Sequence, residues 1–224
     1  DIPVVAALIE TDDGFVLFDT GLDPESLTNP ASQILVQRKV IKSLTKENDI
    51  RLQLRQLGLK PADIRYVVNS HLHYDHTGGN RFFTSAQIYV QKSEYRFAHY
   101  PDTHVAYLYL KHQFDHPLQY ELLEGDHKVV DGVYVTATPG HSPGHQSLLV
   151  ELPKSGLAIL VGDAMYCREN MERNVPPGNV WDMTMSVISM SRLIYLAERE
   201  NGKLFIMHDP QFWEEHKPAP HFYE

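Results

Sequence analysis

Cysteine is almost absent from this sequence: Cys167 is the only one in 224 residues. A single cysteine excludes an internal disulfide framework and favours a reducing compartment, so we expect a cytoplasmic protein. Long apolar runs are lacking as well, and none approaches the roughly 20 residues that a membrane-spanning helix needs. A disulfide-stabilised secreted fold and a membrane-spanning protein are therefore both disfavoured.

Basic clusters are missing too, because lysine and arginine nowhere form a long run, and the formal net charge is −9. Nucleic acids and anionic membrane surfaces both attract a basic footprint, so we expect neither as a partner. The chain shows no repeat, low-complexity segment or long linker, and 42% of its residues are apolar. We therefore expect residues 1–224 to form one domain. Because the chain starts at Asp1 directly before an apolar run, we expect further residues upstream of it.

Histidine, in contrast, is abundant, with 13 residues, and it gathers in the stretch SHLHYDHTGG at residues 70–79. Three histidines and one aspartate stand there within six residues. A stretch this polar is costly to bury unless each group finds a partner. Gly78 and Gly79 allow the backbone to turn closely after it.

Apolar alternation and turn signals predict the elements around this stretch. Strands are expected at residues 3–10, 14–21, 64–70, 87–91, 129–140 (as a pair), 147–152, 156–164 and 203–209. Helical patterns cover residues 31–59, 93–97, 104–114 and 182–200, the last with Asp182 as its N-cap. Strands in early and late sets with helices after each predict an α/β layered fold, in which helices sandwich a pair of sheets.

Polar clusters follow four of the expected strands. HLHYDH comes after VVNS, and three single residues follow the strands TATPG, AILVG and LFIM: His141, Asp163 and His208. Strand ends at one edge of a layered fold converge, and functional sites are built on the loops there. These residues are therefore the candidate site.

The spacing HxHxDH favours two metal ions rather than one. His71 and His73 can point the same way on a tight loop, while Asp75 and His76 turn to a neighbouring position. Imidazole and carboxylate ligands suit zinc, with iron, cobalt or manganese as alternatives. His145, four residues after His141, is an alternative ligand on spacing alone.

The stretch HLHYDH resembles the signature of the metallo-β-lactamase superfamily, and the elements FDTG, TPGH and GD and the closing histidine extend the resemblance over nearly the whole chain. The resemblance implies the αββα metallo-β-lactamase sandwich. It also implies two metal ions and their ligands. The first ion would be held by His71, His73 and His141, the second by Asp75, His76 and His208, with Asp163 bridging the two.

Within the superfamily the chain is most similar to quorum-quenching N-acyl homoserine lactone lactonases. HLHYDHTGG looks like their metal loop, although Thr77 stands where alanine is frequent. Tyr166 lies three residues after Asp163, as in that group, and NVPPGNVWDMTMS and HDPQFW are also similar. Cys167 lies beside this tyrosine, not where β-lactam-hydrolysing relatives have a zinc-binding cysteine, and we interpret it as structural. The resemblance implies a hydrolase that opens the lactone ring of an acyl lactone.

The chemistry expected of such a site is attack by a metal-bridging hydroxide, because two ions lower the pKa of a shared water towards ~7. Tyr166 and one metal ion are expected to stabilise the oxyanion, and Asp75 to carry the proton to the leaving oxygen. Asp19 and Thr20 either orient a ligand histidine or close a turn. Apolar and aromatic candidates for the substrate pocket are Phe82, Phe83, Tyr107, Met165, Tyr166, Val180, Trp181 and Met185.

Other functions compete with this interpretation. A thioesterase of the hydroxyacylglutathione type shares the metal loop, and other ester or phosphotriester hydrolases belong to the same superfamily. A non-catalytic metal-binding module is the remote alternative, which the presence of all seven candidate ligands disfavours. The oligomeric state is left open by the sequence, a homodimer being one alternative.

Overall fold

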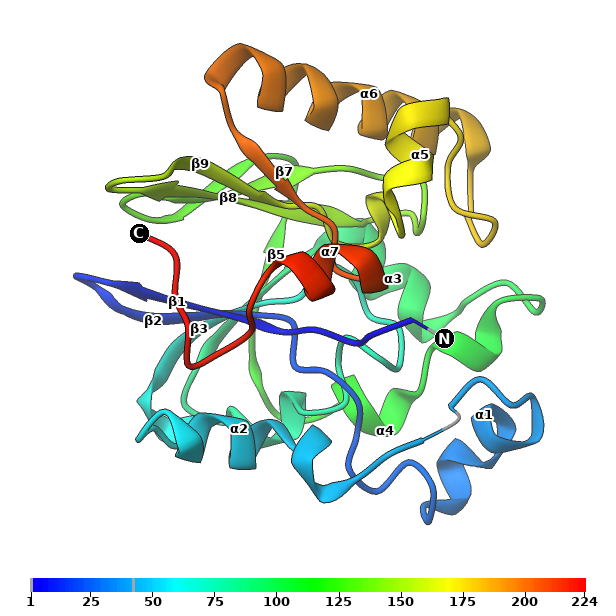
Figure 1. The fold of residues 1–224 in the computed structure, drawn as a ribbon. Coiled ribbons are helices and arrows are strands. Elements are labelled where there is room, and N and C mark those ends of the chain that lie inside the picture. Colours follow the sequence, from blue (N-terminus) through cyan, green and yellow to red (C-terminus); the bar gives the residue numbers. More distant parts are fainter. Residues whose placement is uncertain (1, 42) are drawn as a thin grey trace. The chain divides into compact units, whose positions relative to one another are not determined.

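The structure, a computed structural model, describes residues 2–41 and 43–224 and divides into two compact units, each with one five-stranded sheet (Figure 1). The β1–β5 unit consists of residues 6–90 and 95–122. The β6–β10 unit consists of the residues up to Val5, residues 91–94 and residues 123–224. Each unit carries some of the candidate ligand residues.

The strands of the first unit follow the chain in order, and they are β1 (Ala7–Thr11), β2 (Gly14–Phe18), β3 (Ile64–Val68), β4 (Gln87–Gln91) and β5 (Gln119–Leu123). β1 is antiparallel to β2, whereas β2, β3 and β4 are parallel. The helices are α1 (Gln33–Gln37), α2 (Ile50–Gln56), α3 (Lys92–His99), which follows β4, and α4 (Lys111–Phe114). Ile50 and Leu54 of α2 join Leu17, Ile64 and Val67 in one buried apolar cluster.

The second sheet has the order β10–β9–β8–β7–β6. Its strands are β6 (His127–Val130), β7 (Val133–Ala137), β8 (Gln146–Leu152), β9 (Gly156–Leu160) and β10 (Lys203–Phe205). Only β10 and β9 pair in parallel; the other pairs are antiparallel. The helices are α5 (Arg168–Arg173), α6 (Met183–Glu200) and α7 (Pro210–Glu215).

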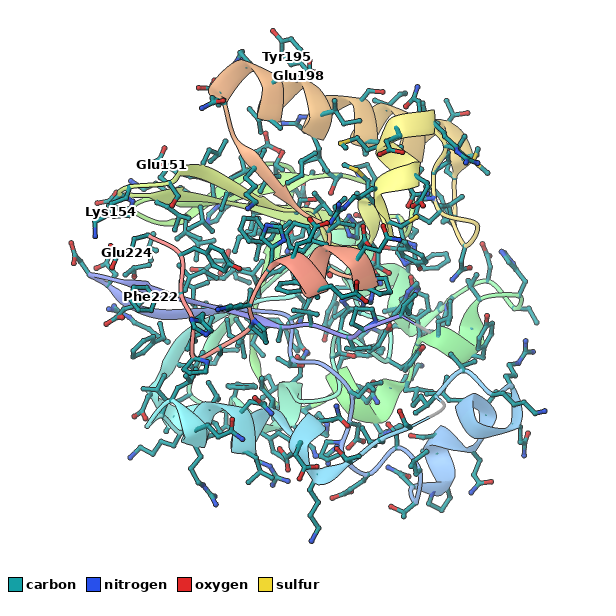
Figure 2. All side chains as sticks on the ribbon, in the orientation of Figure 1. Glu151, Lys154, Tyr195, Glu198, Phe222 and Glu224 are labelled. Carbon is teal, nitrogen blue, oxygen red and sulfur yellow. The ribbon has the colours of Figure 1, made fainter. Side chains whose placement is uncertain are left out.

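Helix α6 begins where the sequence predicts, because the Asp182 side chain accepts a hydrogen bond from the Met185 N–H. Its inner face packs on β9 and β10, and Met190 and Leu193 are buried in that contact. On its other face Tyr195 projects outward, 61% exposed (Figure 2).

Several expected elements are shorter than predicted. Among the described residues of 31–59, the expected helical pattern forms α1 and α2 with two short 3-10 turns. Lys39 takes a left-handed φ of 54° after α1 and so leaves the helical conformation. Residues 104–114 split into a 3-10 turn and α4. The last strand ends at Phe205 rather than at His208, because residues 207 and 208 form a turn. β5, α5 and α7 carry no signal strong enough for the sequence to predict them.

Strand direction explains where the polar clusters lie. β2 and β3 are parallel, and Phe18 lies opposite Val68, so the loops that follow these two strands leave the sheet at the same edge. In the second sheet β7, β9 and β10 run one way and β8 the other. The loops after β7, β9 and β10 therefore emerge together at one edge, and the expected convergence of strand ends is confirmed within each unit. Among the described residues, no helix is both long and apolar enough to cross a membrane.

Candidate metal centre

The loop after β3 buries its four candidate ligands, none of which is more than 9% exposed: His71, His73, Asp75 and His76. His71 Nε2 lies 2.8 Å from His73 Nδ1, so two ring nitrogens point at one place. His76 Nε2 lies 3.7 Å from the Asp75 carboxylate. Burying so many imidazoles and a carboxylate together is costly unless something binds them, and divalent metals bind these groups.

Asp19 holds this loop from the end of β2. Its carboxylate accepts hydrogen bonds from the Ser70 backbone N–H at 2.7 Å and from the Ser70 hydroxyl at 2.8 Å. The same group lies 2.8 Å from His76 Nδ1. Asp19 itself has a left-handed φ of 60°, a conformation that a non-glycine residue adopts at a cost. Of the two expected roles, Asp19 therefore orients a candidate ligand histidine.

Thr20 has the other expected role, because it closes the turn of the loop after β3 rather than orienting a histidine. Its backbone N–H donates to the His76 carbonyl at 2.9 Å, and its hydroxyl donates to the Asn80 side chain at 2.9 Å. Gly78 lies so close to the chain that a Cβ there would stand 1.9 Å from the Asp23 nitrogen. Only glycine permits this approach, which agrees with the close turn predicted after HLHYDH.

Asp163 lies between two histidines in the β6–β10 unit. One carboxylate oxygen is 3.3 Å from His141 Nε2, and the other is 2.9 Å from His208 Nε2. All three side chains are at most 3% exposed. A carboxylate whose two oxygens face different histidines is arranged as a bridging ligand would be.

The ring nitrogens are also held in the way that metal ligands require. His208 Nδ1 lies 2.6 Å from the Pro3 carbonyl oxygen, which only accepts hydrogen bonds, so Nδ1 carries the proton and Nε2 the lone pair. Asp19 imposes the same tautomer on His76. An oxygen acceptor behind each ligand histidine is typical of protein metal sites. The donor set of this chain therefore fits divalent metal ions.

Tyr166 belongs to the same edge of the second sheet. Its ring centroid lies 5.8 Å from that of His141 and 5.2 Å from that of His208. Its backbone N–H donates to Asn170 at 2.8 Å, which fixes the turn into α5. Cys167 precedes α5 as its N-cap, and burial raises the pKa of its thiol.

His145 is placed differently from its neighbour His141. Its Nε2 accepts a hydrogen bond from the Asp163 backbone N–H at 2.9 Å, so the lone pair of this nitrogen is engaged by a donor within the protein.

Glu94 was missed by the sequence analysis. It is fully buried and accepts from the Ser142 hydroxyl at 2.6 Å and the Gly144 N–H at 3.0 Å. The hydrogen bonds of His145 and Glu94 leave no local sequence signal, because their partners are distant in the chain.

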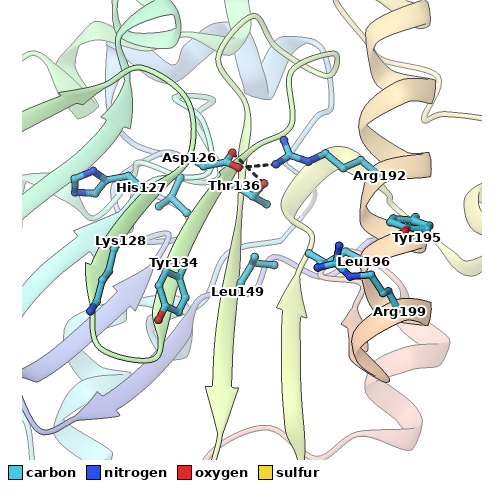
Figure 3. A pocket seen from close by; sticks show the side chains of 11 residues that line it. Asp126, His127, Lys128, Tyr134, Thr136, Leu149, Arg192, Tyr195, Leu196 and Arg199 are labelled. Carbon is cyan, nitrogen blue, oxygen red and sulfur yellow. Dashed lines mark hydrogen bonds and ion pairs between the residues drawn. The ribbon is translucent and has the colours of Figure 1, made fainter.

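The residues expected to line a substrate pocket differ in burial. Met165 and Phe83 are fully buried in apolar cores, whereas Trp181 and Met185 are 40% and 38% exposed. A surface groove of about 610 Å³ lies between α6 and strands β6–β8 (Figure 3). Its Arg192 pairs with Asp126 at 2.6 Å, and none of the seven candidate ligands lines it.

Comparison with known proteins identifies the family. The model of the metallo-beta-lactamase superfamily matches residues 1–208. This chain belongs to the metallo-β-lactamase superfamily, as its metal loop and two-sheet α/β structure indicated, and the predicted fold class is confirmed.

Similar proteins are lactonases. An N-acyl homoserine lactonase of Bacillus cereus is 40% identical over 212 residues, covering 93% of this chain and 82% of that protein. The lactonase AttM of Azorhizobium caulinodans is 36% identical and covers 100% of this chain and 88% of its own length. A solved structure of Bacillus thuringiensis AiiA, a mutant with N-decanoyl-L-homoserine bound at the active site, has a TM-score of 0.88 at 35% identity. The match covers 99% of this chain and 87% of that one.

Proposed function

We propose that this chain is an N-acyl homoserine lactonase, a metal-dependent hydrolase that opens the lactone ring of its substrate. The observation that carries the proposal is the set of buried histidines and aspartates presented at the two sheet edges. The proposal is supported by 40% identity to a lactonase of Bacillus cereus and by a similar solved structure with N-hexanoyl-L-homoserine bound at its catalytic metal centre.

The ligand set of the proposal consists of seven side chains: His71, His73, Asp75, His76, His141, Asp163 and His208. Each is a buried histidine or aspartate of a kind that binds divalent ions. The two oxygens of Asp163 face different histidines, His141 and His208, which supports Asp163 as the ligand shared by two ions. Zinc suits these ligands, because imidazole nitrogen and carboxylate oxygen are among the usual partners of this borderline-soft ion. The ions, when bound, would supply an activated water for attack on the ester carbon.

The remaining steps use this chain's own residues. The Tyr166 hydroxyl donates a hydrogen bond to the carbonyl oxygen as negative charge develops on it. Asp75 accepts the proton released on attack and returns it to the alkoxide oxygen that leaves when the ring opens. The new C–O bond forms first, and the ring C–O bond breaks as the carbonyl is restored, so one water is consumed and one acid is produced.

Metal content and lactone opening test the proposal together. We expect about two divalent ions per chain by elemental analysis, and rapid acid release in a pH-stat from both a short-chain and a long-chain acyl homoserine lactone. A chelator should abolish the acid release, and added zinc should restore it, because the proposed ligands are neutral imidazoles and carboxylates.

Different outcomes separate the alternatives. Two ions without lactone opening would favour the hydroxyacylglutathione-type thioesterase, which S-lactoylglutathione as substrate would reveal. Other ester and phosphotriester substrates would test for side activity in the same assay. No ion and no activity would leave only the fold.

Tyr166→Phe is expected to lower kcat for lactone opening about 10²–10³-fold, because it removes one hydrogen-bond donor to the developing oxyanion. KM should change little, since the neutral carbonyl of the bound substrate needs that donor less. Steady-state kinetics check this result, with the exposed Tyr100→Phe as the matched control. A Tyr166→Phe enzyme with wild-type kcat would show that Tyr166 only packs.

Three further predictions remain part of the proposal. Residues 1–224 act as one hydrolase domain. The compartment is the cytoplasm, as the single cysteine suggests. A homodimer is an alternative that analytical ultracentrifugation tests.

A further inference from the structure

His145 is a fully buried histidine that the proposed chemistry does not use. It stands immediately before β8, four residues after His141. Its Nε2 lies 2.9 Å from the backbone nitrogen of Asp163 and accepts that N–H. This hydrogen bond joins the loop before β8 to the turn after β9, at the residue whose carboxylate faces two histidines.

The neighbours of His145 fix which ring nitrogen carries its proton. A backbone N–H can only donate, so Nε2 must present its lone pair to Asp163. On the other side of the ring, Nδ1 lies 3.1 Å from the Thr138 carbonyl oxygen, which can only accept. Nδ1 therefore carries the proton, and the ring is neutral with both nitrogens engaged.

A short chain of hydrogen bonds holds this ring. The Thr138 hydroxyl lies 2.9 Å from His145 Nδ1 and 2.9 Å from the Ser147 hydroxyl. The Ser147 hydroxyl donates to the Val161 carbonyl at 2.9 Å, two residues before Asp163. The network thus reaches the turn carrying Asp163 at two points, and both hydroxyl residues are at most 1% exposed.

We propose that His145 is a positioning residue for Asp163: it fixes the backbone of Asp163 through the N–H, so that the carboxylate is aimed between His141 and His208. Such a clamp matters here because Gly162, just before Asp163, has a left-handed φ of 56° and no Cβ to restrict its conformation. The inference rests on the proposed metal centre, in which Asp163 is the shared ligand. It assigns His145 a role distinct from that of a metal ligand.

Two substitutions separate this role from simple packing. Alanine at position 145 removes the acceptor, whereas glutamine can place its amide oxygen near the position of Nε2 and accept the Asp163 N–H. We expect His145→Ala to weaken retention of divalent ions about 10–100-fold, as removal of the support behind a metal ligand does elsewhere. His145→Gln should recover most of the loss. The exposed His104→Ala is the control for the loss of a histidine.

The measurement is a zinc titration of metal-free protein with a competing chelator, followed by elemental analysis after gel filtration. The melting temperature of the metal-free proteins is recorded alongside. Comparable melting temperatures for the metal-free alanine and glutamine variants, with different zinc retention, would support positioning. A purely structural defect would instead lower the melting temperature and the zinc retention together.

A second measurement tests directly whether His145 binds a metal ion. In protein loaded with cadmium-113 and labelled with nitrogen-15, the proposed ligand histidines should show nitrogen–cadmium coupling and His145 should not. Coupling at His145 would overturn the inference by making it a ligand. Zinc retention unchanged in His145→Ala, or equally poor in His145→Gln, would also overturn it. Failure of the proposed metal centre is seen separately, because wild-type protein would then hold no zinc.

Discussion

Asp163→Asn is expected to lower kcat/KM for acyl homoserine lactones about 10³-fold, which corresponds to roughly 4 kcal/mol of transition-state stabilisation at 1.36 kcal/mol per tenfold change. Asparagine keeps the shape of the side chain but replaces one carboxylate oxygen by an amide NH₂. The wild-type oxygens lie 3.3 Å and 2.9 Å from His141 Nε2 and His208 Nε2. The amide cannot serve both sides as a charged, shared ligand.

Metal content should fall with the activity. We expect Asp163→Asn to hold about one ion where the wild type holds about two, measured by elemental analysis of the same preparations used for kinetics. The exposed Asp12→Asn is the matched control and should match the wild type in both assays. An Asp163→Asn enzyme with two tightly held ions and near-wild-type activity would remove Asp163 from the ligand set.

Gly78→Ala is expected to destabilise the fold by about 3 kcal/mol or more, because the new Cβ meets main-chain atoms that cannot rotate away. It would stand 1.9 Å from the Asp23 nitrogen and 2.3 Å from the Leu22 carbonyl carbon. The Gly78 N–H donates to the Gly21 carbonyl at 2.8 Å, so the two segments cannot separate without losing that bond.

Urea unfolding of the metal-free protein measures this effect without a contribution from bound ions. Gly178→Ala is the matched control, since nothing lies within 4 Å of a Cβ at that position, and its free energy of unfolding should stay within about 0.5 kcal/mol of the wild type. If both variants had the same urea midpoint of unfolding as the wild type, the close approach of Gly78 to Leu22 and Asp23 would not exist in solution.

The sequence predicted the fold class well because strand signals are local. Apolar runs of five or so residues ending in turn residues identified β2, β3, β4, β8 and β9 within a few residues of their bounds. The sequence signals failed to predict elements whose conformation depends on tertiary contacts. α5 and α7 are short, and residues 38–49 look helical by composition although Lys39 leaves the helical region. Propensity cannot anticipate such breaks, because tertiary contacts override it.

What the sequence by itself determined is the chemistry available to the site. It supplied the histidines and aspartates, their position after strand ends, and the glycines that let the metal loop turn. Residue type and spacing suffice for this, since they depend only on neighbours along the chain. The superfamily followed from the same motifs and is confirmed by the comparisons.

Only the tertiary structure decided how each donor is held. Asp19 lies 57 residues from His76, yet its carboxylate sets the tautomer of that ring. His208 is held by the carbonyl of Pro3, 205 residues away. His141 and His145 look equivalent in HSPGH, but the second ring already accepts the N–H of Asp163, 18 residues further on. Such pairings depend on strand order and register, which bring distant residues to one edge of a sheet and leave no trace in local spacing.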